Sequence, residues 1–143
     1  VKQYYPDHAG KAIPKEIIIP NEYMQLLRYS NGGLIVNGER EFGYFSLQEL
    51  RTYYFLYGFP KWAPLFLPVA FNGGGKFYAY DFRNRNNKKI IAVSSSDLDY
   101  DSSVILGSNL EEVLSNITNI EDELSTLYKR PEPSEAEKTK NGN

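Results

Sequence analysis

Apolar side chains are most concentrated between residues 65 and 83, in the segment LFLPVAFNGGGKFYAYDFR. Residues 65–71 are nearly all apolar, and residues 77–82 show the two-residue alternation of a pleated strand. The glycines between the two segments accept positive φ, so they can close a hairpin. Because the second strand carries bulky side chains on both faces, we expect it in the middle of a sheet that is covered on both sides.

Helical spacing and stop signals predict two helices before this hairpin. The first begins near Pro20, carries apolar residues at helical intervals and ends at the NGG segment 31–33. The second begins at residues 46–49, SLQE, which form a capping box, and runs to about Tyr57.

Shorter signals complete the predicted secondary structure. Residues 34–45 predict a further hairpin with its turn at Asn37-Gly38, and residues 90–94 predict a strand. A second capping box at residues 108–111, SNLE, predicts the start of the last helix, for which residues 116–119 are a candidate break.

The length of 143 residues is that of one domain. Prolines and a glycine exclude a continuous helix in residues 1–18, which we interpret as an irregular lead-in, with Ile17–Ile19 forming either an edge strand or an apolar plug. Residues 129–143 lack aromatic and branched apolar side chains, so we expect a disordered polar tail. The predicted domain therefore spans residues 19–128.

Composition excludes several classes of protein. A net charge of −2 argues against the basic field that attracts nucleic acid. The absence of cysteine excludes disulfides, thiolate catalysis and cysteine metal sites. No apolar run approaches 18 residues and no signal-peptide pattern is present, so we expect a soluble cytoplasmic protein without a membrane span.

Two motifs resemble ligand loops but lack key residues. Residues 73–76, GGGK, lack the upstream Gly and the following Ser or Thr of a phosphate-binding loop, so turn glycines are the better interpretation. Asp97, Asp99 and Asp101 resemble the start of a calcium loop, but Ser stands where such a loop needs its sixth-position Gly and twelfth-position Glu. We interpret this run as lying outside the core, in a solvated loop or a protein-contact surface, and we predict no metal site and no cofactor.

The inventory for catalysis is small. His8 is the single imidazole and lies in the irregular lead-in. A two-His metal site therefore cannot form within one chain, and a Ser-His site could form only around His8. A carboxylate pair could form between Asp81 and Asp97 or Asp99, but Asp81 follows a strand, where a carboxylate more often accepts backbone N–H groups of a turn. We therefore expect a protein that is not an enzyme.

Aromatic residues are unusually dense between residues 53 and 62, which contain Tyr53, Tyr54, Phe55, Tyr57, Phe59 and Trp62. Exposed Tyr and Trp side chains are typical anchors of protein contacts. The alternative is a second small core beneath the following loop, and the sequence leaves both open. The candidate partner-binding residues are Tyr54, Tyr57, Trp62, Asp97, Asp99, Tyr100 and Asp101.

Taken in order, four segments resemble the SMI1/KNR4 family, also called the SUKH superfamily, over about residues 19–118. They are IPNEY…YSNGG (19–33), SLQEL (46–50), FLPVA…G…Y…D (66–81) and LEEVL (110–114). Two positions differ from the family pattern. Lys76 replaces the acid that usually follows the last turn glycine, and Leu26-Leu27 stands where an aromatic residue is common.

The resemblance implies an α+β fold: a single domain with a curved, mostly antiparallel sheet of about six strands flanked by helices. It also implies a non-catalytic bacterial immunity protein that binds and neutralises a polymorphic toxin, often a nuclease, with no direct contact to nucleic acid. A regulatory scaffold of the cell-wall glucan-synthesis type is the alternative, and an enzyme or metal-binding protein using acidic residues is third. The residues expected to have structural roles are Asn31, Gly32, Gly33, Pro68, Gly75 and Asp81.

Overall fold

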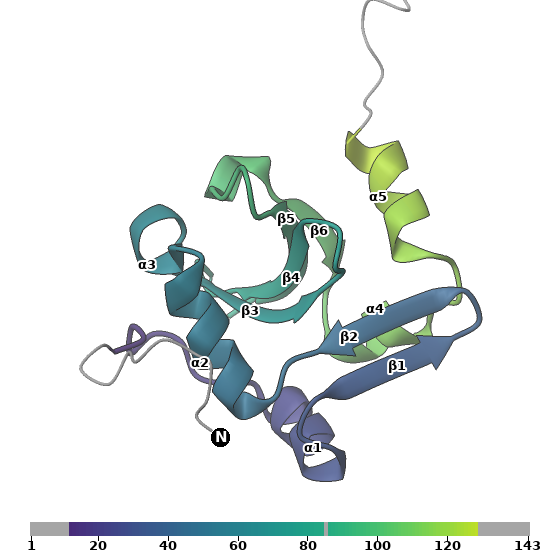
Figure 1. Cartoon of the computed structure of the whole chain (residues 1–143), viewed down its shortest axis with the longest axis horizontal. Coiled ribbons are helices and arrows are strands. Elements are labelled where there is room, and N and C mark those ends of the chain that lie inside the picture. Colours follow the sequence, from purple (N-terminus) through teal and green to yellow (C-terminus); the bar gives the residue numbers. More distant parts are fainter. Residues whose placement is uncertain (1–11, 85, 129–143) are drawn as a thin grey trace, which may run out of the picture.

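The computed structural model describes residues 12–84 and 86–128 (Figure 1). Its six strands pair antiparallel in chain order and form one curled sheet. The strands are β1 (Gly33–Asn37), β2 (Arg40–Tyr44), β3 (Phe66–Phe71), β4 (Lys76–Asp81), β5 (Lys89–Ser94) and β6 (Val104–Gly107). The helices are α1 (Asn21–Tyr29), α2 (Leu47–Leu56), α3 (Phe59–Trp62), α4 (Leu110–Ser115), α5 (Ile120–Tyr128) and the 3-10 turn η1 (Tyr100–Ser102). The predicted α+β fold with a curved antiparallel sheet is confirmed.

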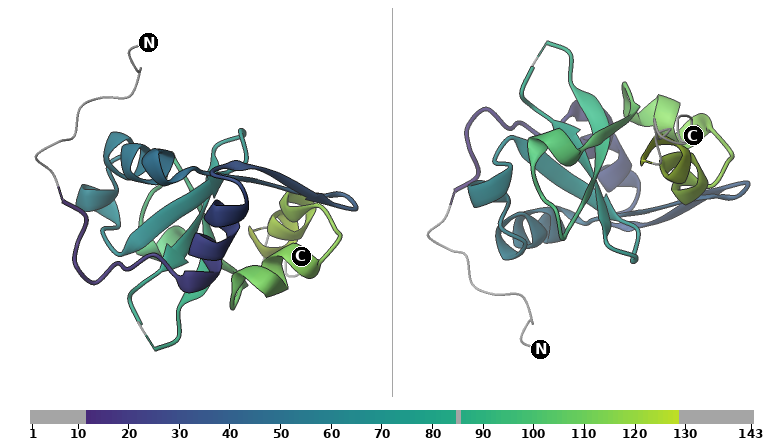
Figure 2. Two further views of the ribbon diagram at one scale, coloured as in Figure 1. Left: turned by 90° about the horizontal axis from the view of Figure 1, so that it is seen from below. Right: turned by 90° about the horizontal axis from the view of Figure 1, so that it is seen from above.

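Strand β4 lies in the middle of the sheet, between β3 and β5, as its two bulky faces predicted. Helices α2 and α3 pack on one side of the sheet, and α1 and α4 pack on the other (Figure 2). Phe77 faces α2 and α3, whereas Tyr78 and Tyr80 face the opposite side. The sheet therefore has an aromatic core on each face.

Tyr54 is buried in the core beneath α2 and α3. Its ring stacks on Phe59 at 5.8 Å between centroids, and its hydroxyl donates a hydrogen bond of 2.8 Å to the Pro64 carbonyl. Because Tyr54 has no exposed surface, the prediction that it contacts a partner is wrong. It packs inward, as the alternative interpretation of this ring cluster had it, but it belongs to the one hydrophobic core of the domain and not to a separate small core.

On the other face, polar groups tie the helices to the sheet. The Glu22 carboxylate accepts hydrogen bonds from the Tyr80 hydroxyl at 2.7 Å and from the Leu110 backbone N–H at 2.9 Å. One side chain of α1 therefore holds both β4 and the start of α4. Burial and this hydrogen bond raise the pKa of Tyr80, which keeps its phenol as a proton donor.

Local signals placed most helix ends correctly. The box at Ser46 and Glu49 is present, with both of its hydrogen bonds, and α2 ends at a left-handed Gly58 with φ 83°. The second box is wrong by one residue, because Asn109 is the N-cap of α4 and its side chain accepts from the Glu112 N–H at 2.8 Å. The break between α4 and α5 is confirmed.

The residues expected to have structural roles lie at turns and junctions. Asn31 accepts a hydrogen bond from the Leu47 N–H at 3.0 Å and so supports the start of the next helix. Gly32 has φ +98°, and a Cβ there would lie 3.1 Å from the Ser46 nitrogen. Gly33, with φ +159°, begins β1.

Pro68 stands at a bulge in the β3–β4 pairing. Gly75, with φ +104°, precedes β4, so a strand begins at the Lys of GGGK, as the turn interpretation predicts. The first hairpin turns at Gly38 and Glu39, one residue later than predicted, because Asn37 pairs with Arg40.

Three further features differ from or refine the predictions. Residues 17–19 form no strand: Ile17 and Ile19 pack against the core while Ile18 is 72% exposed, so the segment is an apolar plug. Leu98, in the acidic run predicted to lie outside the core, is buried. Strand β6 and helix α3 had no prediction of their own. His8 and the predicted tail 129–143 lie outside the described residues.

Candidate protein-binding groove

A groove of 340 Å³ lies where the end of α2 and helix α3 meet the loop after β5. We call it the α3 groove, and its lining residues are Tyr57, Trp62, Ser95, Ser96, Asp97, Leu98 and Asp99. The structure thus brings together four of the seven candidate partner-binding residues: Tyr57, Trp62, Asp97 and Asp99.

The two rings of the groove are held in place while part of their surface stays exposed. Trp62 is 55% exposed, and the Lys61 ammonium lies 4.8 Å from the centre of its ring. A Cβ at Gly58 would lie 3.2 Å from the Trp62 ring, so the glycine lets the indole lie against the helix junction. Tyr57 is 37% exposed and packs edge-on against the buried Phe77 at 4.8 Å between centroids.

The acidic side of the groove is ordered by its own hydrogen bonds. Asp99 caps η1 by accepting from the N–H groups of Asp101 and Ser102, at 2.6 and 3.2 Å. Asp97 accepts from the Ser102 hydroxyl at 2.9 Å. All of these donors are neutral, so the negative charge of both carboxylates remains available to a cationic partner.

Tyr100 and Asp101 do not line the groove. Tyr100 accepts a hydrogen bond from the Leu65 N–H at 3.0 Å, and its ring packs edge-on against Phe66 at 5.0 Å. The Arg83 guanidinium lies 4.6 Å from the centre of that ring. Tyr100 therefore anchors the loop to the sheet, and Asp101 is exposed beside it.

Asp81 has the structural role that its position predicts. It accepts the Arg83 backbone N–H at 3.0 Å and forms an ion pair with the Arg83 guanidinium at 2.8 Å. The hydrogen bonds to Asp81 raise the pKa of Arg83. The carboxylate is thus engaged with its own turn.

The described residues offer neither a metal cluster nor a membrane-spanning helix. Among residues 12–84 and 86–128, no group of three or more His, Cys, Asp or Glu side chains is arranged to hold a metal ion. Over the same ranges, no helix has the length and apolar character needed to cross a membrane.

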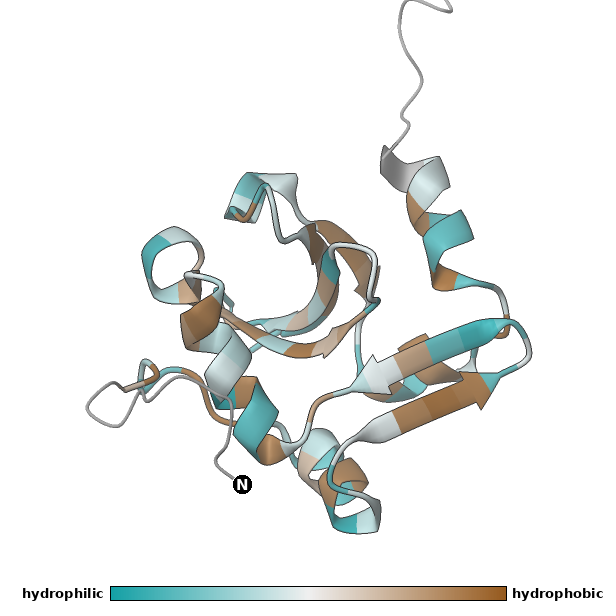
Figure 3. Ribbon diagram, in the orientation of Figure 1, coloured by the Kyte–Doolittle hydropathy of each residue, from teal (hydrophilic) through white to brown (hydrophobic). Residues whose placement is uncertain are grey.

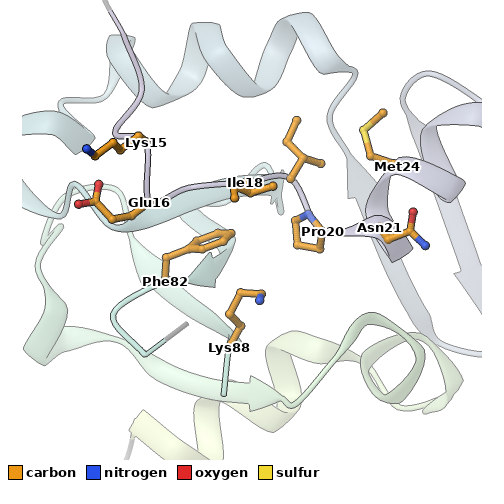
Figure 4. A pocket seen from close by; sticks show the side chains of 9 residues that line it. Lys15, Glu16, Ile18, Pro20, Asn21, Met24, Phe82 and Lys88 are labelled. Carbon is orange, nitrogen blue, oxygen red and sulfur yellow. The ribbon is translucent and has the colours of Figure 1, made fainter. Parts of the chain in front are cut away.

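A larger hollow of 610 Å³ lies between the lead-in, the start of α1 and the end of β4. Ile18, Pro20, Met24 and Phe82 surround it, with Lys88 below (Figure 4). Its lining combines these apolar side chains with the polar Lys15, Glu16 and Asn21.

The sequence identified both segments that line the α3 groove, but it did not predict that they lie next to each other in the folded chain. Residues 57–62 and 95–99 are brought together only by the curl of the sheet, which no local signal reports. Ser95 and Ser96 line the groove and were not predicted as site residues, since Ser is common in any polar loop.

A protein-family comparison places the chain. The sequence model described as SMI1 / KNR4 family (SUKH-1) matches residues 14–116, which is more than half of the chain. No curated protein matches the chain.

Proposed function

The chain belongs to the SMI1/KNR4 family (SUKH-1), and on that basis we propose that it is a cytoplasmic, non-catalytic immunity protein that binds and neutralises a bacterial polymorphic toxin. The α3 groove is the contact surface. The observation that supports this most directly is the meeting of two exposed rings, Tyr57 and Trp62, with two carboxylates, Asp97 and Asp99, in one groove.

The chemistry of the groove suits a basic protein partner. Rigid aromatic side chains bury a large area at little cost in side-chain entropy, so they commonly anchor interfaces. Carboxylates with only neutral donors can pair with Lys or Arg of a partner and speed its approach. A nuclease toxin presents such a basic surface where it holds the phosphates of its substrate.

The distribution of charge along the chain also favours a basic partner. Residues 90–128 contain eight Asp and Glu and no Lys, Arg or His, whereas residues 1–89 contain twelve Lys and Arg and seven Asp and Glu. The acidic part includes the acids of the α3 groove. Local charge of one sign steers an oppositely charged partner to that region even when the net charge is small.

The test first asks whether a gene neighbouring that of this chain encodes a polymorphic toxin, and then uses the toxin domain with its catalytic residue replaced. We expect tight binding by calorimetry, and rescue of cells when the chain is co-expressed with the active toxin. Trp62→Ala should raise Kd about thirtyfold, the loss of about 2 kcal/mol that is typical of a central aromatic anchor.

Tyr29→Ala is the matched control, because Tyr29 is an 88% exposed ring on α1. Its Kd should stay within about twofold of the original. Equal binding by the Trp62 and Tyr29 variants would place the contact elsewhere. A toxin domain that neither binds the chain nor is neutralised by it would contradict the immunity function and favour a regulatory scaffold.

A further inference from the structure

Helices α2 and α3 cover one face of the sheet, but they do not reach the part of that face formed by the first hairpin, β1 and β2. The β3–β4 register sets Phe71 opposite Phe77, on the face that packs beneath α2 and α3. Tyr44 pairs with Ala70, and Ala70 with Tyr78, which places Tyr44 on the opposite face. Since side chains alternate along a strand, Gly43 and its partner Leu34 return to the face of Phe77.

This bare region is apolar and exposed. Leu34 is 59% exposed and Val36 58% exposed, and the two side chains point to the same side of β1. Figure 1 shows α4 behind the hairpin and no helix in front of it, and Figure 3 shows that β1 is strongly hydrophobic. Two neighbouring exposed aliphatic side chains on an edge strand are typical of a surface that another protein covers.

A pocket of 220 Å³ adjoins Leu34, between the hairpin and the start of α5. Phe71 and Ile120 give it apolar walls, and the carboxylates of Glu41 and Glu121 line it as well. Its lining residues include no Lys, Arg or His. An apolar pocket with two acids fits the long aliphatic stem and charged end of a Lys or Arg side chain.

Glu121 is oriented by two neutral donors. The Tyr78 hydroxyl donates to it at 3.3 Å, and the Asn72 side-chain amide donates to the same oxygen. Burial raises the pKa of Tyr78, so its phenol keeps the proton that it donates. The carboxylate is thus fixed in position without a cation to neutralise it among these partners.

The pocket and the α3 groove are linked through one ring contact. Tyr57 lines the groove, Phe71 lines the pocket, and their ring centroids are 6.3 Å apart. A partner that covers Trp62 and Tyr57 can therefore extend over Phe71 onto the hairpin without leaving the same side of the molecule.

We propose that Leu34, Val36, Glu41 and Glu121, which we call the hairpin face, form the second half of the partner contact and receive a Lys or Arg side chain of a basic protein. This inference rests on the proposed function. Charge complementarity favours such a partner over a second copy of this chain, because a symmetric pairing through β1 would bring the acids of one copy toward those of the other.

The experiment measures Kd for the same inactivated toxin domain with Leu34→Ser and with Glu41→Gln. We expect each change to raise Kd about tenfold, the effect of a contact well inside an interface. Ile105→Ser is the control for Leu34, since Ile105 is also 59% exposed and lies on β6, the opposite edge strand. Glu111→Gln, an exposed acid on α4, is the control for Glu41.

Both test positions are exposed, so the variants should keep the circular dichroism spectrum and melting temperature of the original chain. If the original chain binds and the test variants match their controls, the hairpin face is not part of the contact, while the proposed function stands. If the original chain does not bind, both proposals are overturned. A stable dimer that Leu34→Ser dissociates would also overturn the inference, in favour of self-association.

Discussion

At the scale of single residues, Arg40 has the most demanding environment. Its side chain is 2% exposed, yet it carries a full charge. It donates to the Val113 carbonyl at 2.7 Å and to the Thr118 carbonyl at 2.8 Å, and it forms an ion pair with Glu123. These contacts join the first hairpin to the segment between α4 and α5.

We predict that Arg40→Ala lowers the free energy of unfolding by about 3 kcal/mol, because it leaves the buried Val113 carbonyl and the partly buried Thr118 carbonyl without this donor and Glu123 without its cation. Arg28→Ala, at an exposed position on α1, should change it by less than about 0.5 kcal/mol. Urea denaturation measures both values. A loss for Arg40→Ala no larger than that of the control would mean that water replaces these contacts at little cost.

Buried tyrosines predict how stability depends on pH. Burial raises the pKa of Tyr23, Tyr78 and Tyr80, and it raises the pKa of Tyr54 from 10.0 to about 12. The folded chain therefore keeps phenol protons that the unfolded chain releases above about pH 10. The contribution of these groups is complete below that pH and is lost as the pH rises above it.

The expected result is a melting temperature that falls steadily between about pH 10 and pH 12. Tyr80→Phe should show a shallower fall, because one titrating group has been removed, although its melting temperature at pH 8 is lower since Glu22 loses a donor. Tyr29→Phe, at an exposed ring, should follow the original curve. Identical slopes for all three proteins would show that Tyr80 does not resist ionisation.

At the scale of secondary-structure elements, the start of α4 has the sequence of a capping box but a different set of hydrogen bonds. SNLE has the letters of a capping box, but the N-cap is Asn109, and the Glu112 carboxylate accepts a hydrogen bond of 2.8 Å from the N–H of Ser108, the residue before the N-cap. The motif located the helix start to within one residue. It could not choose between adjacent Ser and Asn, which cap helices equally well.

We predict that Asn109→Ala destabilises the protein by about 1 kcal/mol, because the Glu112 N–H loses its acceptor. Ser108→Ala should change stability by less than about 0.5 kcal/mol. Chemical denaturation of the two variants tests this directly. A larger loss of stability for Ser108→Ala than for Asn109→Ala would show that Ser108 is the N-cap, as the sequence motif suggested.

The elements that the sequence predicted have strong local signals, and those it missed are short. The hairpin around residues 72–75 has glycines between two apolar strands, and α2 has both a capping box and a glycine stop. Strand β6 and helix α3 have only four residues each. Their conformation depends on pairing with β5 and on packing of Phe59 against Phe77, which are tertiary contacts.

At the scale of the whole molecule, the uneven charge along the chain predicts how binding depends on salt. Steering by the acidic residues 90–128 should make the association rate with the toxin domain fall steeply as ionic strength rises from about 50 to 500 mM. The dissociation rate should change far less. Stopped-flow fluorescence of Trp62, the single Trp of the chain, measures both rates. An association rate that is independent of salt would contradict electrostatic steering.

The same scale explains why the site was only partly predictable. Composition indicated that some rings must be exposed, but Tyr54 and Trp62 look alike in the sequence. The difference arises because Tyr54 faces the core through Phe59 and Pro64, whereas Trp62 lies at the outer end of α3. The hairpin face had no sequence signal, since Leu34 and Val36 read as ordinary strand residues.

The ties of Arg40 also set an order of events during synthesis on the ribosome. The first hairpin precedes these partners along the chain. The acceptors of the Arg40 guanidinium are the carbonyls of residues 113 and 118, which are translated more than seventy residues later. Until those residues leave the exit tunnel, the Arg40 guanidinium must stay hydrated, and the hairpin lacks its attachment to the segment between α4 and α5. We therefore expect the hairpin to be secured only after the segment between α4 and α5 has been translated, with the apolar β1 strand open until then.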